Sequence, residues 1–281
     1  MQLPKATLLT ALAMLAFAGN SVLCRLALAQ SAIDAASFTS IRLLSGAIVL
    51  ALLVQLRGVR GTRQGSCISA AMLFAYAAGF SYAYLSLPAG TGALLLFGAV
   101  QATMIGWAIR CGERLRPLQL AGLLLAMAGL VGLLLPGLSA PPLFGSLLML
   151  MAGVAWGVYS LRGKGASDPT AVTAGNFLLA VPLALALSAL MYRSTSLDAA
   201  GIAYAVASGA LTSGLGYALW YRVVPLLRAS SAATIQLSVP LLAVIAGALL
   251  LDEAITLRMV LAGMAILGGI ALVVARPAPA R

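Results

Sequence analysis

The side chains that usually carry enzyme chemistry are scarce in this chain. It has no histidine, which removes a serine–histidine pair and the commonest metal ligand. The three cysteines, Cys24, Cys67 and Cys111, form no CxxC motif and no other metal-ligand spacing. Both lysines, Lys5 and Lys164, fall outside the apolar segments, which disfavours a serine–lysine dyad. We therefore expect no enzyme activity, no catalytic residues, no bound metal and no cofactor.

Polar side chains inside apolar segments are the stronger candidates for function. Asn20, Gln101 and Gln236 have such positions, as do Thr103 and Asn176. A polar group costs free energy in lipid, so it is retained for a reason. Either these groups line a cavity and hydrogen-bond to a substrate, or they join helices, which contributes about 0.6 kcal/mol on average. We predict that Asn20, Gln101 and Gln236 bind substrate.

Arg42 and several aromatic residues complete the predicted binding site. Arg42 lies about one turn inside its segment. Its guanidinium could pair with a substrate carboxylate, or it could reach the membrane interface or pair with Asp34. Aromatic rings provide stacking surfaces and hydroxyls for an amphipathic ligand, although many rings in membrane proteins only face lipid or the interface. The rings that we predict to line the cavity are those of Tyr82, Trp156, Tyr159 and Tyr217.

The elements that hold these residues must be membrane-spanning helices. The chain of 281 residues is 62% hydrophobic and 8% charged, with a mean hydropathy of +1.07. Soluble domains are about 25% charged, so lipid must solvate much of this surface. The apolar runs show no strand-like alternation, which predicts an all-α polytopic fold, although the first run could also be a signal peptide. The ten predicted spans are residues 6–26, 38–56, 67–85, 90–109, 118–135, 143–161, 171–191, 201–221, 231–251 and 257–275.

The distribution of basic residues predicts the orientation. With the N-terminus in the cytoplasm, 13 of the 17 Lys and Arg residues fall on the cytoplasmic side. Both termini are then cytoplasmic, as in a multi-pass protein of the bacterial inner membrane. The net charge of +11 comes from short clusters between apolar runs, which argues against a nucleic-acid partner.

The two halves of the chain resemble each other. Gly19 corresponds to Gly157, and Asp34 corresponds to Asp168. Glu113 and Glu253 each follow a predicted span at equivalent positions. Five spans is an odd number, so the second copy must cross the membrane in the opposite sense. We predict a first five-helix repeat over 1–136 and an inverted repeat over 143–276, which together form one transport domain with substrate between them.

The acidic residues avoid the middle of every predicted span. All six, which are Asp34, Glu113, Asp168, Asp198, Asp252 and Glu253, fall at helix ends or in loops. Proton relays in membranes normally use a buried Asp, Glu or His. We therefore predict that transport involves no carboxylate-based proton coupling at the midplane.

These features resemble the EamA-type drug/metabolite transporters. The resemblance rests on the two five-helix units, on Gly19 and Gly157, on Arg42, and on the Glu before each last helix. The residues 87–91 and 97–101 look most like the aromatic amino-acid exporters (YddG type), although the proline common in the fourth helix is replaced by Val100-Gln101.

The resemblance implies a secondary transporter that exports small metabolites through a central cavity by alternating access. The substrates implied are amino acids, including aromatic and other apolar ones. The alternative is a multidrug or cation exporter of the same superfamily, which the absence of a membrane-embedded Glu disfavours. The expected surroundings are the lipid bilayer, and no obligate protein partner is inferred.

Overall fold

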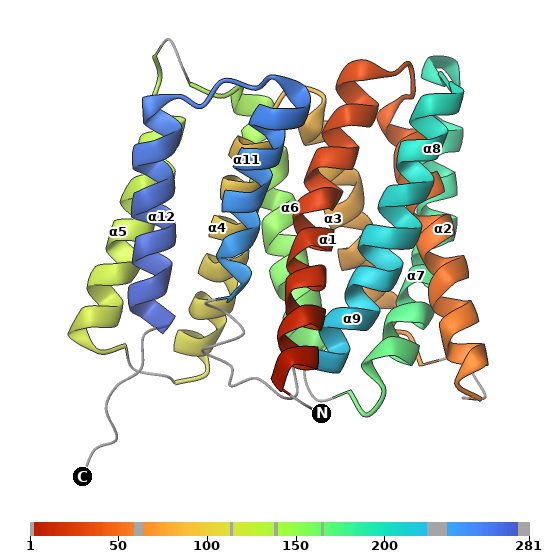
Figure 1. Ribbon diagram of the computed structural model, residues 1–281, viewed down its shortest axis with the longest axis horizontal. Helices are drawn as coiled ribbons and strands as arrows, with labels where there is room; N and C mark the ends of the chain where they lie inside the picture. The colour runs from red at the N-terminus through yellow and green to blue at the C-terminus, as the bar shows by residue number, and fades with distance from the viewer. Residues whose placement is uncertain are drawn as a thin grey trace.

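The computed structural model describes residues 3–58, 64–112, 115–137, 140–163, 166–223 and 235–274. Throughout these ranges the chain forms helices joined by short connections and has no strand, as Figure 1 shows. The structure therefore confirms the prediction of an all-helical polytopic fold. Glu113, Lys164 and the segment 224–234 lie outside the described residues.

The helices begin and end within a few residues of the predicted apolar runs. Polar residues, glycine and proline separate the apolar runs, so hydropathy determines most of the helix boundaries. In chain order the first seven are α1 (Leu3–Gln30), α2 (Ala35–Leu56), α3 (Cys67–Tyr84), α4 (Ala89–Arg110), α5 (Pro117–Leu134), α6 (Leu143–Arg162) and α7 (Pro169–Leu190). A 3-10 turn, η1 (Tyr192–Ser194), precedes α8 (Ala199–Ala207), η2 (Ser208–Leu215) and α9 (Gly216–Val223), and the chain ends with α11 (Ser238–Leu251) and α12 (Leu257–Val274).

The eighth predicted span is one continuous helix with an unusual middle. The segments α8, η2 and α9 run without a break from Ala199 to Val223, and η2 is a π-helix of 8 residues. A π-helical stretch shifts the direction of every side chain that follows it, and such stretches cluster at functional sites. Periodicity in the sequence gives no sign of this change.

Among the described residues, eight helices are long and apolar enough to cross a membrane, counting Ala199–Val223 as one. Two shorter apolar helices, α11 and α12, follow them, and the start of the ninth predicted span lies outside the described residues. The polytopic architecture is therefore established, whereas the count of ten spans stays a prediction.

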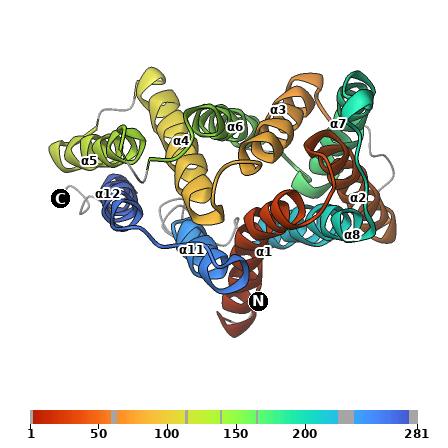
Figure 2. The ribbon, with the colours of Figure 1, turned by 90° about the horizontal axis from the view of Figure 1, so that it is seen from above.

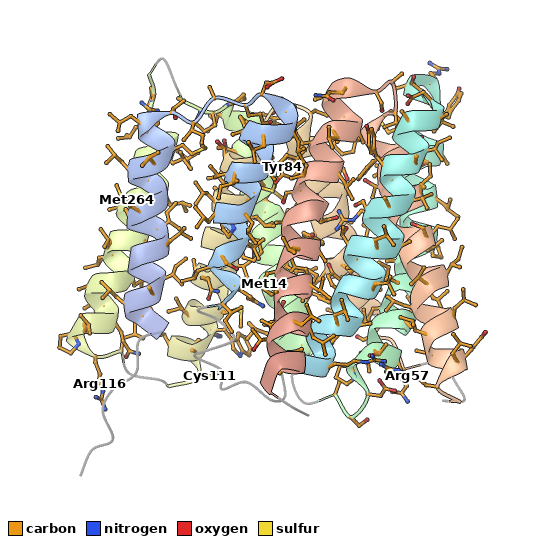
Figure 3. The ribbon with its side chains drawn as sticks, in the orientation of Figure 1. Met14, Arg57, Tyr84, Cys111, Arg116 and Met264 are labelled. Carbon is orange, nitrogen blue, oxygen red and sulfur yellow. The ribbon has the colours of Figure 1, made fainter. Side chains whose placement is uncertain are left out.

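Successive helices run in alternating directions through the bundle (Figure 1). Both termini lie at the same end, and the labelled Arg57 and Arg116 lie at that end too (Figure 3). The turn between α11 and α12 lies at the opposite end. Seen from above, α5 and α12 form a pair at one side of the molecule (Figure 2).

Acidic side chains stabilise the first turns of three helices, α2, α7 and α8. Asp34, Asp168 and Asp198 are the N-cap residues of α2, α7 and α8, and each carboxylate accepts backbone N–H bonds. Asp34 also accepts from the backbone N of Ser196, which ties the start of α2 to the connection before α8. Burial raises the pKa of Asp34, but the hydrogen bonds from Ser37, Ser196 and Ala36 outweigh it, so the pKa lies below its ordinary value.

Large apolar side chains cover the outside of the bundle. Leu56, Phe144 and Leu190 are 84%, 74% and 77% exposed, and many other leucines on the outer faces are half exposed. Such a surface would be unstable in water and is suited to lipid chains. The interior is filled instead by small residues and aromatic rings, which lets the helices approach closely.

The α5–α12 pair shows how close that approach is. A Cβ built on Gly122 would lie 2.6 Å from the carbonyl oxygen of Gly269 and 2.7 Å from Cβ of Leu272. A Cβ built on Gly132, ten residues further along α5, would meet no atom within 4 Å. Only 17% of the α5 span is buried, against 56% for α4, so this contact is its main attachment.

We expect Gly122→Ala to lower the unfolding temperature of the detergent-solubilised protein, because overpacking a tight contact costs about 1–3 kcal/mol. Gly132→Ala is the matched control on the same helix and should be neutral or slightly stabilising, since alanine favours helix. Equal unfolding temperatures for the two variants would show that the Gly122–Gly269 contact does not anchor α5.

Candidate functional site

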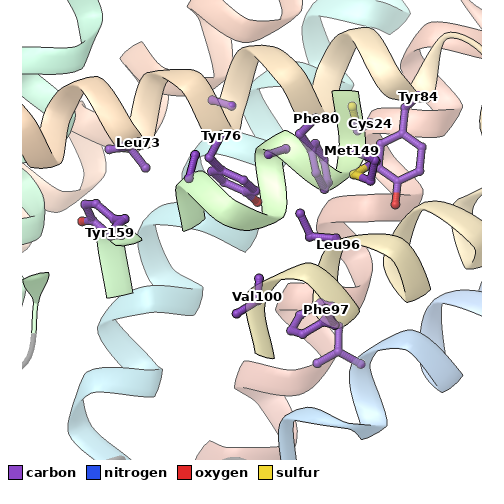
Figure 4. Packing of buried hydrophobic residues seen from close by; sticks show 14 of the residues in the cluster. Cys24, Leu73, Tyr76, Phe80, Tyr84, Leu96, Phe97, Val100, Met149 and Tyr159 are labelled. Atoms are coloured by element: carbon purple, nitrogen blue, oxygen red, sulfur yellow. The ribbon is translucent and has the colours of Figure 1, made fainter. Parts of the chain in front are cut away.

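An aromatic stripe on α3 forms one wall of the candidate site. Tyr76, Phe80 and Tyr84 are spaced four residues apart and therefore share one face of the helix. All three side chains are buried, and adjacent ring centroids are 5.4 and 4.7 Å apart. Figure 4 shows these rings in a row along α3, with Leu96 and Phe97 of α4 facing them. The stripe directs one phenol, that of Tyr76, toward the middle of the bundle.

A central cavity lies beside this wall. The centre of a water molecule can occupy about 30 Å³ of it. That is room for roughly two waters, so a metabolite enters only if the walls move. The lining comes from α1, α3, α4, α6, the α8–α9 span and the residues before α11, namely Phe17, Asn20, Ser21, Tyr76, Phe80, Leu96, Phe97, Trp156, Thr212, Ser213, Tyr217 and Gln236.

Asn20 of α1 organises the polar part of the cavity. Ser208 Oγ donates to Asn20 Oδ1 at 2.8 Å, and Thr212 Oγ1 lies 3.2 Å from the same oxygen. Asn20 Nδ2 in turn donates to the phenol oxygen of Tyr76 at 3.2 Å. The amide thereby links α1 to both the α8–α9 span and α3, and its buried polar atoms are satisfied.

The π-helix η2 makes this arrangement possible. It brings Ser208, Thr212 and Ser213 onto the side facing α1 and α2. Gly209 lets the two backbones meet, because a Cβ there would overlap the carbonyl oxygen of Arg42 and the hydroxyl of Ser45. A larger residue at position 209 would push α2 away from the network.

Arg42 of α2 lies directly behind the cavity wall. Its side chain is 2% exposed, Nε donates to Ser213 Oγ at 3.3 Å, and Nη2 donates to the Tyr76 phenol oxygen at 3.0 Å. The guanidinium carbon lies 5.1 and 5.0 Å from the ring centroids of Tyr76 and Phe80, within cation–π range. Three side chains that line the cavity thus contact this cation.

The interpretation that Arg42 reaches the interface or pairs with Asp34 is wrong. Asp34 accepts its bonds from backbone N–H groups at the start of α2 and from Ser196, and Arg42 faces the interior. The physical reason is the helix geometry: the two residues are eight positions apart, about 12 Å along the axis. The N-cap role also holds the carboxylate at the end of the helix.

Aromatic rings close the other side of the cavity around Trp156. Its ring centroid lies 4.8 Å from that of Tyr76, 5.1 Å from that of Tyr217 and 5.3 Å from that of Tyr159, with the last pair stacked. Phe17 contacts Tyr217 edge-on at 5.8 Å. These rings make an apolar surface opposite the Asn20 amide.

The structure brings together six of the eight residues predicted from the sequence. Asn20, Trp156, Tyr217 and Gln236 line the cavity, Arg42 lies behind its wall, and Tyr159 stacks on Trp156. The other two lie elsewhere. Gln101 lines a separate, smaller apolar cavity between α4, α5 and α12, and Tyr82 is half-buried and absent from the cavity lining.

Several lining residues were missed by the sequence reasoning. On α3, Tyr76 and Phe80 line the cavity, whereas the predicted Tyr82 does not. The spacing of four residues between Tyr76 and Phe80 places both on one helix face and could have identified them. No sequence signal identifies Ser213, since the π-helix determines its direction. Among the described residues, no cluster of three His, Cys, Asp or Glu side chains could hold a metal ion.

An ion pair closes the bundle at the end opposite the termini. Arg25 Nε of α1 lies 3.1 Å from Glu253 Oε1, and the other carboxylate oxygen accepts from the backbone N of Ala89 at 2.7 Å. Glu253 therefore caps the start of α4, where the helix dipole favours an anion. Asp252 precedes it in a left-handed conformation (φ 52°), which ends α11 and turns the chain back. Arg25 Nη1 also donates to the carbonyl of Tyr84 at 2.9 Å.

Comparisons with known proteins agree with this architecture. Residues 143–275 match the EamA-like transporter family. The chain is 58% identical over 269 residues to "Uncharacterized protein PA1977" of Pseudomonas aeruginosa, which covers 95% of this chain and 94% of that protein. It is 29% identical over 192 residues to an "Uncharacterized transporter" of Archaeoglobus fulgidus, which covers 67% of this chain and 68% of that protein. A solved crystal structure shares the fold, with a TM-score of 0.69 and 23% identity over 96% of this chain and 97% of the other.

We expect Tyr76→Phe to lower the unfolding temperature, because it leaves donors of Arg42 and Asn20 unpaired in the interior. An unsatisfied buried group costs about 1–3 kcal/mol, and more when it is charged. Tyr82→Phe, on another face of the same helix, is the matched control and should change little. If both variants unfold at the wild-type temperature, the phenol of Tyr76 is not the link between Arg42 and Asn20.

Proposed function

We propose that this chain is a transporter of the EamA-like family, whose model matches residues 143–275, and that it exports small metabolites by alternating access through the central cavity. The leading substrates are amino acids, including aromatic and other apolar ones. The observation that carries the proposal is the cavity itself, in which rings of α3, α6 and α9 face the polar groups of Asn20, Thr212 and Ser213. Such a lining suits a molecule with one apolar end and one polar end.

The buried Arg42 argues against the alternative, a multidrug or cation exporter. A guanidinium with three contacts to lining residues gives the cavity a positive potential, which repels cations. The lining among the described residues contains no Asp or Glu that would attract a cation. A neutral or anionic substrate therefore fits this site better.

The pattern of helix contacts supports two inverted repeats, 1–136 and 143–276. If the halves were exchanged, α1 would take the place of α6, α3 that of the α8–α9 span and α4 that of α11. The contacts of α6 with α3 and α4 then correspond to the contacts of α1 with the α8–α9 span and α11. The contacts α2–α7 and α5–α12 each join equivalent helices of the two halves, so the exchange leaves them unchanged. Segments of the same three helices in each repeat line the cavity, as alternating access between two halves requires.

The Arg25–Glu253 pair is our candidate for the closure on the outer side. It joins α1 and the start of α4, both in the first half, to the α11–α12 turn in the second half. We place the termini in the cytoplasm of a bacterial cell, where the positive-inside rule puts the basic connections. The closure then separates the cavity from the outside, and export requires that it open.

We propose no carboxylate-based proton coupling at the midplane. The five acidic residues that the structure describes are helix caps or lie in the α11–α12 turn. Transport down the substrate gradient is sufficient for the removal of excess metabolite.

We expect purified protein in liposomes loaded with unlabelled phenylalanine to accumulate labelled phenylalanine by counterflow, with no strong stimulation by an imposed pH gradient. Trp156→Ala should reduce the rate about tenfold, because it removes the ring at the centre of the aromatic wall. Phe144→Ala, on the lipid-exposed face of the same helix, is the control and should transport normally. Absence of counterflow in the wild type would overturn amino-acid export, and strong stimulation by a pH gradient would overturn the uncoupled mechanism.

We expect Glu253→Gln to expose the cavity to the outside more often. In a background with the native cysteines replaced by alanine, Ser21→Cys reports on the cavity through an impermeant maleimide added outside. Loss of the ion pair and of the charge at the start of α4 removes about 1 kcal/mol, which predicts roughly fivefold faster labelling.

Asp252→Asn is the matched control for that experiment, because it removes the neighbouring charge and asparagine tolerates the left-handed conformation. Labelling that is unchanged in Glu253→Gln, or equally fast in Asp252→Asn, would show that the Arg25–Glu253 pair is not the outer closure.

A further inference from the structure

Arg42 carries a hydrogen-bonding capacity that its surroundings do not fill. A guanidinium has five N–H donors and stays protonated at every physiological pH. Nε and Nη2 have partners in Ser213 and Tyr76. Nη1 has none, and it is the one buried side-chain nitrogen or oxygen without a hydrogen-bond partner among the side chains that the structure describes.

Its charge is also uncompensated. Within the described part of the chain, no Asp or Glu forms an ion pair with Arg42. The ion pair found there joins Arg25 and Glu253 at the end of the bundle. The partners of Arg42 are two hydroxyls and two ring faces, all formally neutral. A buried charge left in this state is destabilising, so a protein retains one where something else completes it.

We infer that Arg42 is the anchor for a substrate carboxylate, and that the preferred substrates are monocarboxylates with an apolar or aromatic tail, with or without an α-ammonium group. This inference rests on the proposed transport function and names the substrate class of the same cavity. A carboxylate accepts two parallel N–H bonds from a guanidinium, which is the geometry that Nη1 and a neighbouring donor can offer. The tail then lies against the rings of Trp156 and Tyr217.

The net charge of Arg42 together with a bound ligand distinguishes the possible ligands. A monocarboxylate brings the site from one positive charge to zero. A zwitterion leaves it at plus one, and its ammonium finds no carboxylate in the described lining. The Asn20 carbonyl, which could accept from an ammonium, already has Ser208 and Thr212 beside it. A primary amine would bring a second positive charge and is excluded.

Three probes with the same phenyl tail test this directly. They are 3-phenylpropionate, which has only the carboxylate, phenylalanine, which has both groups, and phenethylamine, which has only the ammonium. Binding is measured as the rise in unfolding temperature of the detergent-solubilised protein, and transport as competition with labelled phenylalanine in counterflow. We expect 3-phenylpropionate to bind at least as tightly as phenylalanine, and phenethylamine to have no effect in either assay.

Substitutions at Arg42 separate recognition from structural support. Arg42→Met replaces the cation with an apolar side chain of similar length, so the ligand-free protein should unfold at the wild-type temperature or higher. Its affinity for 3-phenylpropionate should fall at least about tenfold. Arg42→Lys keeps the charge without the planar donors and should bind with intermediate affinity. Arg162→Gln is the matched control, because Arg162 also donates to two side-chain hydroxyls, those of Ser69 and Ser66, but lies outside the cavity lining.

The outcomes are distinguishable from those of the transport proposal. If phenylalanine shows no counterflow but 3-phenylpropionate stabilises the wild type and not Arg42→Met, the carboxylate site stands and amino-acid export fails. If phenethylamine binds better than 3-phenylpropionate, or Arg42→Met binds 3-phenylpropionate like the wild type, the inference is overturned. Should Arg42→Met fail to fold, equal affinity of Arg42→Lys and the wild type for 3-phenylpropionate would overturn it.

Discussion

A cation buried in an apolar bundle must be surrounded by hydrogen-bond acceptors, dipoles and ring faces. Arg42 is such a cation, and it constrains the residues in the middle of this molecule. Tyr76 and Ser213 accept its hydrogen bonds, and Phe80 and Tyr76 present their rings to it. Tyr76 is held in turn by Asn20, which is held by Ser208 of the π-helix. The close approach of Gly209 to the backbone of Arg42 keeps these groups in range. Helices α1, α2, α3 and the α8–α9 span thus all contribute to the surroundings of one charge.

The placement of opposite charges explains why that site stays positive. The carboxylates of Asp34, Asp168 and Asp198 are bound to backbone N–H groups at helix starts, where the helix dipole stabilises them. Glu253 caps α4 and pairs with Arg25 at the edge of the bundle. The described acidic groups are therefore engaged at the helix ends, and the middle is left with a cation that a ligand can neutralise.

The fold itself could be predicted well from the sequence, and the site only in part. Long apolar runs must form helices in lipid, because backbone groups have no other partner there, and the helices α1 to α9 begin and end close to the predicted boundaries. Trp156, Tyr217 and Asn20 could be identified because polar and aromatic residues are rare in such runs. Gln101 and Tyr82 have the same residue types and depths but other helix faces, and the low amphipathic contrast of these helices gives no indication of which face is interior.

By itself, therefore, the sequence determined the class of protein, the approximate limits of the helices and the position of the acidic residues at their ends. Hydropathy and the cost of unpaired backbone groups act locally along the chain, so a linear pattern is enough to decide these properties. The tertiary structure alone decided that Arg42 is interior with Nη1 lacking a hydrogen-bond partner, that Tyr76 and not Tyr82 contacts it, and that the π-helix directs Ser213 toward it. These properties depend on helix rotation, which is determined by the packing of residues far apart in the chain.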